Sequence, residues 1–429
     1  MRKFLAFGFL TILMLATQLT KADVIVIDIN ETSANKFPLA IPHFINASGG
    51  SAGSTGSRMQ ELMLKDFRLT GMFDVWDDDR LPRNDYNLVD IDFAQWKAFE
   101  VQAMIKGVLT QEGGQTVVQL RLYDVTSGKM LVGKQYAVDG DKYIDVVHRF
   151  VDSAMQALTG IRGPFESKIV ASCGKTNKEN ISTFEMDDSR RGGITKSGAN
   201  NTSPTWSFDG SRIAYMSRLK NGELHVFTAG ASGGSSQVTN YKGFGSVNIT
   251  PAWTPDGNLV IASAKDGDTE LYMVTPGGRI LSQITKSFNA DLAPSINKNN
   301  EMVFVSERAG QVHIFKGGLG GGAVRMTFVG SHNEQPDWSP DGSKIVFSSG
   351  GGIRQDIFMM ESDGSNLVRL TEGEGGNSSP TWSPDGRFIS FDSTRGGLFI
   401  MRDDGTNQTM IEKTGGCKNA DWGPWLSQE

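Results

Sequence analysis

The feature that most constrains this chain is a motif of the form Pro-x-Trp-Ser-Pro-Asp-Gly that recurs through its second half. Full or near-full copies begin at Pro204, Pro251, Pro336 and Pro380. A degraded copy begins at Pro294, where Ile296 replaces the tryptophan. The Trp or Ile of successive copies is 42 to 47 residues apart. Self-similarity at this period indicates a repeat architecture with one supersecondary unit per copy.

Each copy predicts four short strands. Pro-Asp-Gly makes a tight reversal, because proline presets φ and glycine accepts the left-handed conformation. In the copy at Pro336, a run of alternating aliphatic residues follows at 344–348, a second strand at 356–360 and a short run at 367–371. Four strands in about 43 residues are typical of a propeller blade. An open β-solenoid is the alternative.

The two ends of this region predict how the ring closes. Residues 419–424 form the first strand of a further copy, and residues 167–172 match the second strand at 343–348. We therefore expect the C-terminal strand to complete a blade that begins near residue 165. The anchors at 206, 253, 296, 338, 382 and 422 then give an all-β six-bladed β-propeller over residues 163–429. A ring closed in this way leaves no free sheet edge.

The two cysteines take equivalent positions in this register. Aligned on the copy at Pro336, Cys417 matches Asn333 and Cys173 matches Ser349. Pairing outward from the turn, with Trp338 opposite Lys344, places the two cysteines across an antiparallel pair at about 4.5–5.5 Å between Cα atoms. A disulfide can span that distance. The sequence therefore predicts a Cys173–Cys417 bond, with two unrelated buried thiols as the alternative.

Residues 1–22 predict a secretory signal. Arg2 and Lys3 precede an apolar run over residues 4–19, and small residues at Thr20 and Ala22 fit a cleavage site before Asp23. The apolar run is shorter than the ~20 residues that span a bilayer. A retained anchor is the alternative. We expect a mature protein that is not inserted in a membrane.

Residues 23–162 predict a small α+β domain. Helical spacing covers residues 57–69, 92–99 and 143–158, and a Gly/Ser loop covers residues 48–57. Strand-like runs cover residues 24–29, 73–76, 101–109, 117–125 and 130–138, with Gly113-Gly114 and Ser127-Gly128 as hairpin turns.

Charge and motifs exclude several functions. The net charge of -6 argues against a nucleic-acid partner, since phosphate affinity requires clustered Lys and Arg. Residues 49–53 and 230–234 match the hydrolase pattern G-x-S-x-G but lack the required strand, elbow and helix context. The histidines show no metal-ligand spacing. We expect no cofactor, no metal site and no catalytic residue.

The whole arrangement resembles the TolB family, periplasmic components of the Tol–Pal system. The resemblance rests on the repeats together with the mature start Asp23-Val24-Ile25-Val26-Ile27-Asp28 and the terminal Ala420-Asp421-Trp422-Gly423-Pro424. It implies a monomeric binding protein of the periplasm that maintains outer-membrane integrity and supports cell division. It implies two partners, the peptidoglycan-associated lipoprotein Pal at the propeller mouth and the C-terminal domain of TolA at the N-terminal segment.

The resemblance assigns residues to both partners. The TolA-binding segment comprises Asp23, Val24, Ile25, Val26, Ile27 and Asp28. The Pal-binding rim comprises Asn201, Ser203, Asn248, Thr250, Asp291, Leu292, Asn333, Glu334, Asn377, Ser379 and Asn419. The alternative for each rim residue is that it only caps a turn. The alternative for the whole chain is a periplasmic hydrolase or a propeller that binds a small ligand in its channel.

Overall fold

The computed structural model describes residues 36–48, 50–77, 91–196, 199–241, 247–351, 354–411 and 416–427. The predicted signal at 1–22, the strand at 24–29 and the TolA-binding segment lie outside these residues. In the described part of the chain, no helix is both long and apolar enough to cross a membrane.

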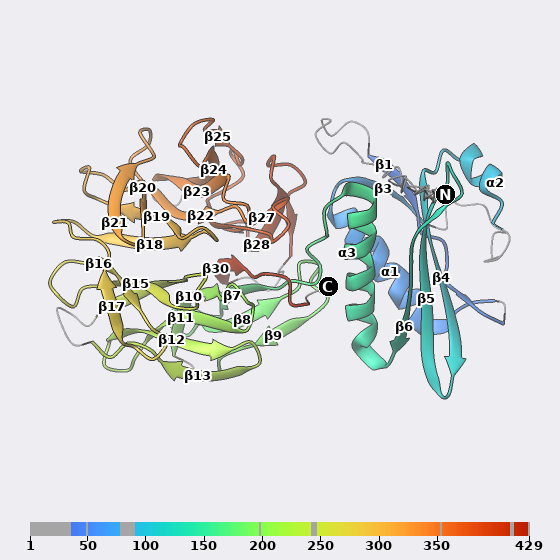
Figure 1. The fold of residues 1–429 in the computed structure, drawn as a ribbon, viewed down its shortest axis with the longest axis horizontal. Helices are drawn as coiled ribbons and strands as arrows, with labels where there is room; N and C mark the ends of the chain where they lie inside the picture. The colour runs from blue at the N-terminus through green and yellow to red at the C-terminus, as the bar shows by residue number, and fades with distance from the viewer. Residues whose placement is uncertain are drawn as a thin grey trace, which may run out of the picture.

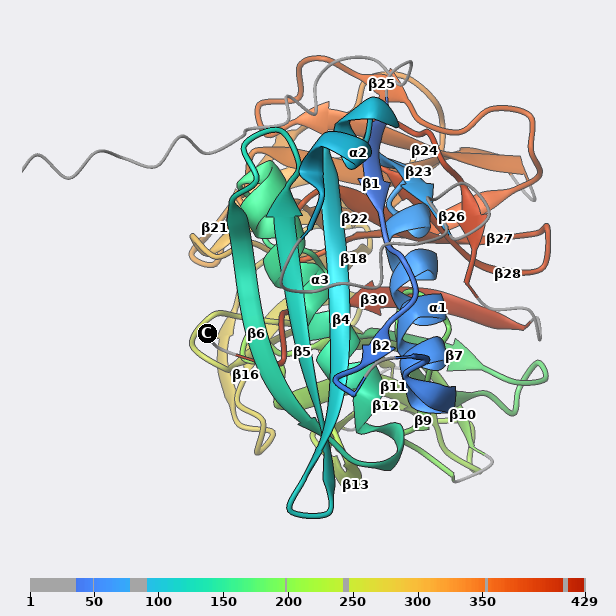
Figure 2. The same ribbon diagram turned by 90° about the vertical axis from the view of Figure 1, so that its right-hand side faces the viewer.

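The N-terminal domain is one mixed sheet with helices on both faces (Figures 1 and 2). The sheet order is β3-β1-β4-β5-β6, and β2 pairs with β4. β1 pairs in parallel with β3 and β4, whereas β4, β5 and β6 form antiparallel hairpins. The elements are β1 (Phe37–Ala40), β2 (Ile45–Asn46), α1 (Gly53–Leu69), β3 (Phe73–Trp76), α2 (Phe93–Ala98), β4 (Ala103–Glu112), β5 (Gln115–Asp124), β6 (Met130–Val138), the 3-10 helix η2 (Gly140–Lys142) and α3 (Tyr143–Thr159).

Within the described residues, each helix and strand predicted for this domain is found, with shifted ends, whereas β1 and β2 were not predicted. α1 begins at Gly53 rather than Ser57, so the last residues of the predicted Gly/Ser loop are its first turn. Gly56 in this turn leaves no room for a side chain, because a Cβ there would lie 2.3 Å from the Ala52 Cβ. α2 begins after Asp92, whose carboxylate accepts hydrogen bonds from the next turn as an N-cap.

The second region is a six-bladed propeller, which confirms the predicted fold. Each blade is a four-stranded antiparallel sheet. In order outward from the channel, the blades are β10 (Asn200–Trp206), β11 (Arg212–Arg218), β12 (Leu224–Gly230), β13 (Gly233–Gln237); β14 (Asn248–Trp253), β15 (Leu259–Ser263), β16 (Glu270–Val274), β17 (Ile280–Gln283); β18 (Asp291–Ile296), β19 (Glu301–Ser306), β20 (His313–Gly318), β21 (Gly321–Arg325); β22 (Asn333–Trp338), β23 (Lys344–Gly351), β24 (Arg354–Glu361), β25 (Val368–Arg369); β26 (Asn377–Trp382), β27 (Phe388–Ser393), β28 (Gly397–Arg402), β29 (Thr409–Met410); and β30 (Cys417–Trp422), β7 (Ile169–Cys173), β8 (Asn180–Phe184), β9 (Arg191–Gly193).

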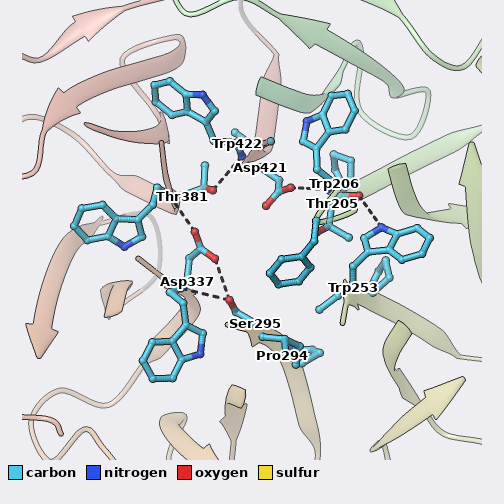
Figure 3. A pocket seen from close by; sticks show the side chains of 18 of the residues that line it. Thr205, Trp206, Trp253, Pro294, Ser295, Asp337, Thr381, Asp421 and Trp422 are labelled. Carbon is cyan, nitrogen blue, oxygen red and sulfur yellow. Dashed lines mark hydrogen bonds between the residues drawn. The ribbon is translucent and has the colours of Figure 1, made fainter. Parts of the chain in front are cut away.

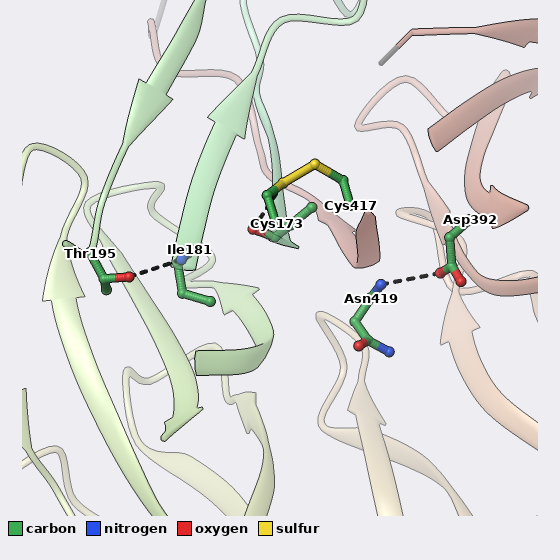
Figure 4. The surroundings of a disulfide bond; sticks show 7 residues. Cys173, Ile181, Thr195, Asp392, Cys417 and Asn419 are labelled. Carbon is green, nitrogen blue, oxygen red and sulfur yellow. Dashed lines mark hydrogen bonds between the residues drawn. A yellow bond between two sulfur atoms is a disulfide. The ribbon is translucent and has the colours of Figure 1, made fainter. Parts of the chain in front are cut away.

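The sixth blade joins the two ends of the region. β30 pairs with β7, and Cys417 lies opposite Cys173. The two residues form a disulfide with 4.0 Å between their Cα atoms (Figure 4). The predicted bond and the predicted closure by the C-terminal strand are both confirmed, and the alternative of two unrelated thiols is excluded.

The register between the cysteines and the turn differs from the prediction. Trp338 pairs with Ile345, not with Lys344, whereas Asn333 pairs with Ser349 as expected. A β-bulge between Glu334 and Asp337 makes the difference, because it adds one residue to the inner strand. The counted register was therefore right at the cysteines and wrong at the turn.

The two domains share one hydrophobic core. α1 and α3 lie between the N-terminal sheet and the propeller (Figure 1). Phe67 of α1 and Phe150 of α3 belong to the same buried cluster as Phe388 and Trp422 of the propeller. The Arg387 guanidinium donates to Thr159 Oγ1 at 2.9 Å and to the carbonyls of Ile161 and Arg162. The two domains are therefore packed as one body at this contact.

Candidate binding site at the propeller channel

All six inner strands carry the same β-bulge. In each strand one residue of the bulge adopts the left-handed conformation, with φ between 43° and 53°. These residues are Ser203, Thr250, Ala293, Gln335, Ser379 and Asn419. Five of them precede a proline, and Ala420 follows the sixth. Non-glycine residues at positive φ are strained and persist only where the surroundings fix them.

Contacts between blades hold this ring in place. The Gln335 side chain donates to Ser379 Oγ at 2.8 Å and accepts from the Ser379 backbone N–H at 2.9 Å. The Ala293 N–H donates to Thr250 Oγ1 at 3.2 Å. The ring residues also line a channel cavity of about 440 Å³. The bulge thus brings backbone and side-chain polar groups to the channel and joins neighbouring blades at these positions.

A second tier of side chains follows two positions later in each strand. Asp421 Oδ2 accepts from the Trp206 N–H at 2.6 Å, Asp337 Oδ2 accepts from the Trp382 N–H at 3.0 Å, and Thr381 Oγ1 accepts from the Trp422 N–H at 3.1 Å. Ser295 Oγ donates to Asp337 Oδ1 at 3.0 Å. Figure 3 shows these groups meeting around the channel, with both carboxylates directed into it.

The two channel carboxylates influence each other. Burial raises the pKa of Asp421 to about 8, and the negative charge of Asp337 adds to this rise, whereas the Trp206 N–H opposes it. Burial also raises the pKa of Asp337, against the bonds from Trp382 and Ser295. Both side chains have partial access to channel water, but protein surrounds them, and this enclosure disfavours the charged forms.

The tryptophans of the motif pack between blades rather than into the channel. Trp206, Trp253, Trp338, Trp382 and Trp422 are buried, and Ile296 takes their place in the third blade. Trp253 donates its indole N–H to the Thr205 carbonyl at 3.2 Å, and the Arg212 guanidinium lies 4.6 Å from its ring centroid. The motif therefore serves the contacts between blades first.

The structure divides the predicted rim residues into two groups. The first group is buried and comprises Asn201, Asn248, Asp291, Asn333 and Asn377. Asn333 donates to the Val329 carbonyl, Asn248 accepts from Ser263 Oγ, and Asp291 pairs with Arg308 at 2.6 Å. These contacts favour the alternative that such residues hold turns. The residues left near the channel or its mouth are Ser203, Thr250, Leu292, Glu334, Ser379 and Asn419, of which Ser379 is buried but lines the cavity.

Three exposed apolar side chains were not singled out from the sequence. Phe288 is 101% exposed, Phe328 is 73% exposed and Val329 is 60% exposed. They lie in the connections that lead into the inner strands β18 and β22. The two aromatic residues each fall three residues or fewer after a Thr that ends a blade, at Thr285 and Thr327, and this position is the signal that could have identified them.

The two G-x-S-x-G matches do not form a nucleophile elbow. Ser232 lies in the hairpin between β12 and β13. Ser51 Oγ accepts from the Gly53 N–H at the start of α1. A strained strand-to-helix turn is needed to expose such a serine.

Known proteins match this chain along both domains. A model described as the TolB amino-terminal domain matches residues 25–131, and one described as the TolB beta propeller domain matches residues 155–426. The chain belongs to the TolB family. This membership and the propeller fold confirm the predicted resemblance and the prediction that the protein is not an enzyme.

Individual TolB relatives show how far the similarity extends. The Tol-Pal system protein TolB of Desulfosudis oleivorans is 31% identical over 265 residues, covering 59% of this chain and 58% of the relative. That of Hahella chejuensis is 27% identical over 245 residues and 56% of each chain. The alignments thus span little more than half the length of these relatives. The structure of TolB from Acinetobacter baumannii superposes with a TM-score of 0.78 over 91% of this chain and 97% of that chain, at 23% identity. That likeness concerns the fold.

Proposed function

We propose that this TolB-family protein is a periplasmic binding module of the Tol–Pal system that connects Pal with TolA. The observation that carries the proposal is the match of both TolB models, in order, to the two domains. In this role the protein supports outer-membrane integrity and cell division. Its action is binding rather than catalysis.

Pal binds, in this proposal, at the mouth surface, which we define as Phe288, Phe328, Val329 and the half-buried Ser203, Thr250, Leu292, Glu334 and Asn419. Exposed aromatic side chains are typical anchors of protein interfaces. Polar groups around them supply hydrogen bonds at the edge of an interface. The mouth surface offers both.

TolA binds, in this proposal, to the N-terminal segment from Asp23 to about Ser33. This segment precedes Lys36, the first residue that the structure describes. Pal at the mouth changes the availability of the segment to TolA. Because coupling between two sites is reciprocal, TolA must change the affinity for Pal by the same factor.

A pull-down with purified Pal and the TolA C-terminal domain of the same organism tests the proposal. One bait is the mature chain from Asp23, and the other starts at Ala34. We expect both baits to capture Pal and only the longer bait to capture TolA. Failure of the mature chain to capture either partner would contradict the proposed function.

Substitution at the mouth tests where Pal binds. We expect Phe288→Ala together with Phe328→Ala to weaken Pal binding at least tenfold, because alanine removes both aromatic anchors. The matched control is Val324→Ala, since Val324 is 67% exposed on the outer strand β21. Equal Kd values for the two variants in calorimetry would place Pal elsewhere.

The channel cavity favours a second candidate, which is a small-ligand site. Its volume of about 440 Å³ and its mixed lining of prolines, hydroxyl side chains and two aspartates lie within the range of ligand pockets. Asp421→Asn would then change binding of a ligand found in a small-molecule screen. The same variant should leave Pal capture at the mouth unchanged.

A further inference from the structure

Three ionisable side chains meet in a closed space between the domains, away from the channel. Asp66 lies on α1, His148 on α3 and Asp187 on the connection between β8 and β9 of the propeller. Asp66 is 0% exposed, and the other two are 2% exposed. One potential ligand atom from each residue lies within 4.8 Å of the other two. No part of the proposed function uses this cluster.

Asp66 has no hydrogen bond that would justify its burial. Neither carboxylate oxygen has a hydrogen-bond partner, and the His148 Nε2 atom lies 3.8 Å from Oδ2. The neighbouring buried residues of α1, Met63 and Phe67, are apolar. A buried carboxylate without a donor is strongly unfavourable, so Asp66 must either carry a proton or be compensated by a further positive group.

The distances suit a small cation. His148 Nε2 lies 3.2 Å from Asp187 Oδ2 and 3.8 Å from Asp66 Oδ2. A tetrahedral ion with bonds of about 2.0–2.1 Å holds its ligand atoms roughly 3.3–3.4 Å apart. The two separations from His148 Nε2 therefore differ from that spacing by less than about half an ångström.

A second layer of contacts orients the imidazole for this role. His148 Nδ1 faces Glu185 Oε2 at 3.8 Å, so Nε2 is left to the two aspartates. Ser189 Oγ lies 2.6 Å from Glu185 Oε2, and Arg190 Nε donates to the same oxygen at 3.1 Å. A carboxylate behind a ligating histidine is the usual arrangement at zinc sites.

We propose that Asp66, His148 and Asp187 form a structural site for a divalent metal ion of the Zn²⁺ class that ties α1 and α3 to the propeller. One imidazole and two carboxylates are ligands that Zn²⁺ accepts, and a water or a bidentate carboxylate completes the coordination. The ligands come from positions 66, 148 and 187, so no short spacing in the sequence marks the site. The site is independent of the proposed Pal and TolA surfaces.

Metal content of the mature chain tests the proposal. The protein is stripped with a chelator, loaded with ZnCl₂, dialysed and analysed by mass spectrometry for metal per chain. We expect one Zn²⁺ per wild-type chain, a rise of several degrees in Tm, and loss of both in Asp66→Asn and His148→Gln. The matched control is His225→Gln, because His225 is also buried but lies beside a single carboxylate, Glu223, at 3.2 Å. This control should keep one Zn²⁺.

X-ray absorption of the Zn-loaded wild-type protein identifies the metal ligands without any variant, so it tests the site even if a variant fails to fold. A shell of nitrogen and oxygen at about 2.0 Å, with the outer pattern of one imidazole, supports the site. Absence of bound Zn²⁺ in the wild type, an inner shell without imidazole, or a folded Asp66→Asn that keeps its metal would overturn the proposal.

Discussion

The channel and the contact between the domains are built in different ways. Around the channel, six residues in equivalent positions of the repeat share one backbone conformation. Between the domains, each polar contact is made by a residue pair that has no equivalent in the other blades. The bulge residue of every inner strand is left-handed and lines the channel. By contrast, Arg387 reaches Thr159 and the chain after it, and Asn407 donates to the Leu69 carbonyl at 2.7 Å. The comparison shows that the repeat builds a channel, while residues that depart from the repeat attach the other domain.

The largest expected effect concerns the bond that closes the ring. Replacing Cys173 and Cys417 together by serine should lower the free energy of unfolding by about 3–5 kcal/mol, because the bond closes a loop of 244 residues. Urea denaturation of oxidised wild type and the double variant measures this difference. Equal midpoints would show that the hydrogen bonds between β30 and β7 are sufficient to close the ring.

The second effect concerns one of the contacts between the domains. Arg387 is buried, and its Nε donates to Asp385 Oδ2 at 2.8 Å while the rest of the guanidinium reaches α3. Arg387→Ala should lower the free energy of unfolding by about 3 kcal/mol, because the fully buried Asp385 carboxylate then loses its cationic partner.

The control for this prediction is Arg395→Ala. Arg395 pairs with the exposed Glu374 at 3.1 Å in the same blade, and such a surface pair contributes less than about 1 kcal/mol. Thermal unfolding compares the two variants. Similar losses of stability would mean that the contact between the domains does not depend on Arg387.

The smallest effect concerns the channel carboxylate of Asp421 and depends on pH. The pKa of Asp421 is raised to about 8, so the folded protein holds a proton that the unfolded chain releases near pH 3.9. This group therefore lowers stability progressively as pH rises from about 4 to about 8. We expect Asp421→Asn to raise the free energy of unfolding by about 1–2 kcal/mol at pH 8.5 and to change little at pH 4, after allowance for channel water.

Asp209 is the matched control, because its pKa is shifted in the opposite direction from that of Asp421. Hydrogen bonds from Ser207 and Ser211 lower its pKa to about 2. Its stabilising contribution is present above pH 3.9 and is lost as pH falls through 2, so Asp209→Asn should destabilise the protein at neutral pH. Denaturation midpoints between pH 4 and pH 8.5 measure both variants. An Asp421→Asn profile parallel to wild type would show that the channel does not suppress the charge of Asp421.

The features that the sequence predicts correctly belong to the repeats, and most of those it misses involve residues outside them. The number of blades and the pairing of Cys173 with Cys417 could be predicted because the motif is repeated. A copy whose sequence has diverged, such as the one at Pro294, is still identified by its spacing from the intact copies. The bulge was not foreseen, because nothing in the residue types shows that a serine or glutamine before proline will take positive φ. Burial of Asn333 was also missed, since asparagine in a turn can face either solvent or the backbone.

Residues outside the repeats gave no such help. Asp66 and His148 each lie among the polar positions that any helix surface could carry, and Asp187 follows a strand in the other domain. Only the packing of α1 and α3 against the propeller brings the three together. The exposed Phe288 was missed for the converse reason, because an aromatic residue beside a blade is first expected to be buried.

Closure of the sixth blade by β30 also sets an order of events in time. A chain that emerges from its N-terminus presents β7, β8 and β9 long before β30, which starts at Cys417. Until β30 is made, one edge of β7 has no partner strand, and Cys173 remains a free thiol. Formation of the disulfide therefore marks the moment at which the ring becomes complete, and a pulse-chase measurement of thiol labelling would time the maturation of each molecule.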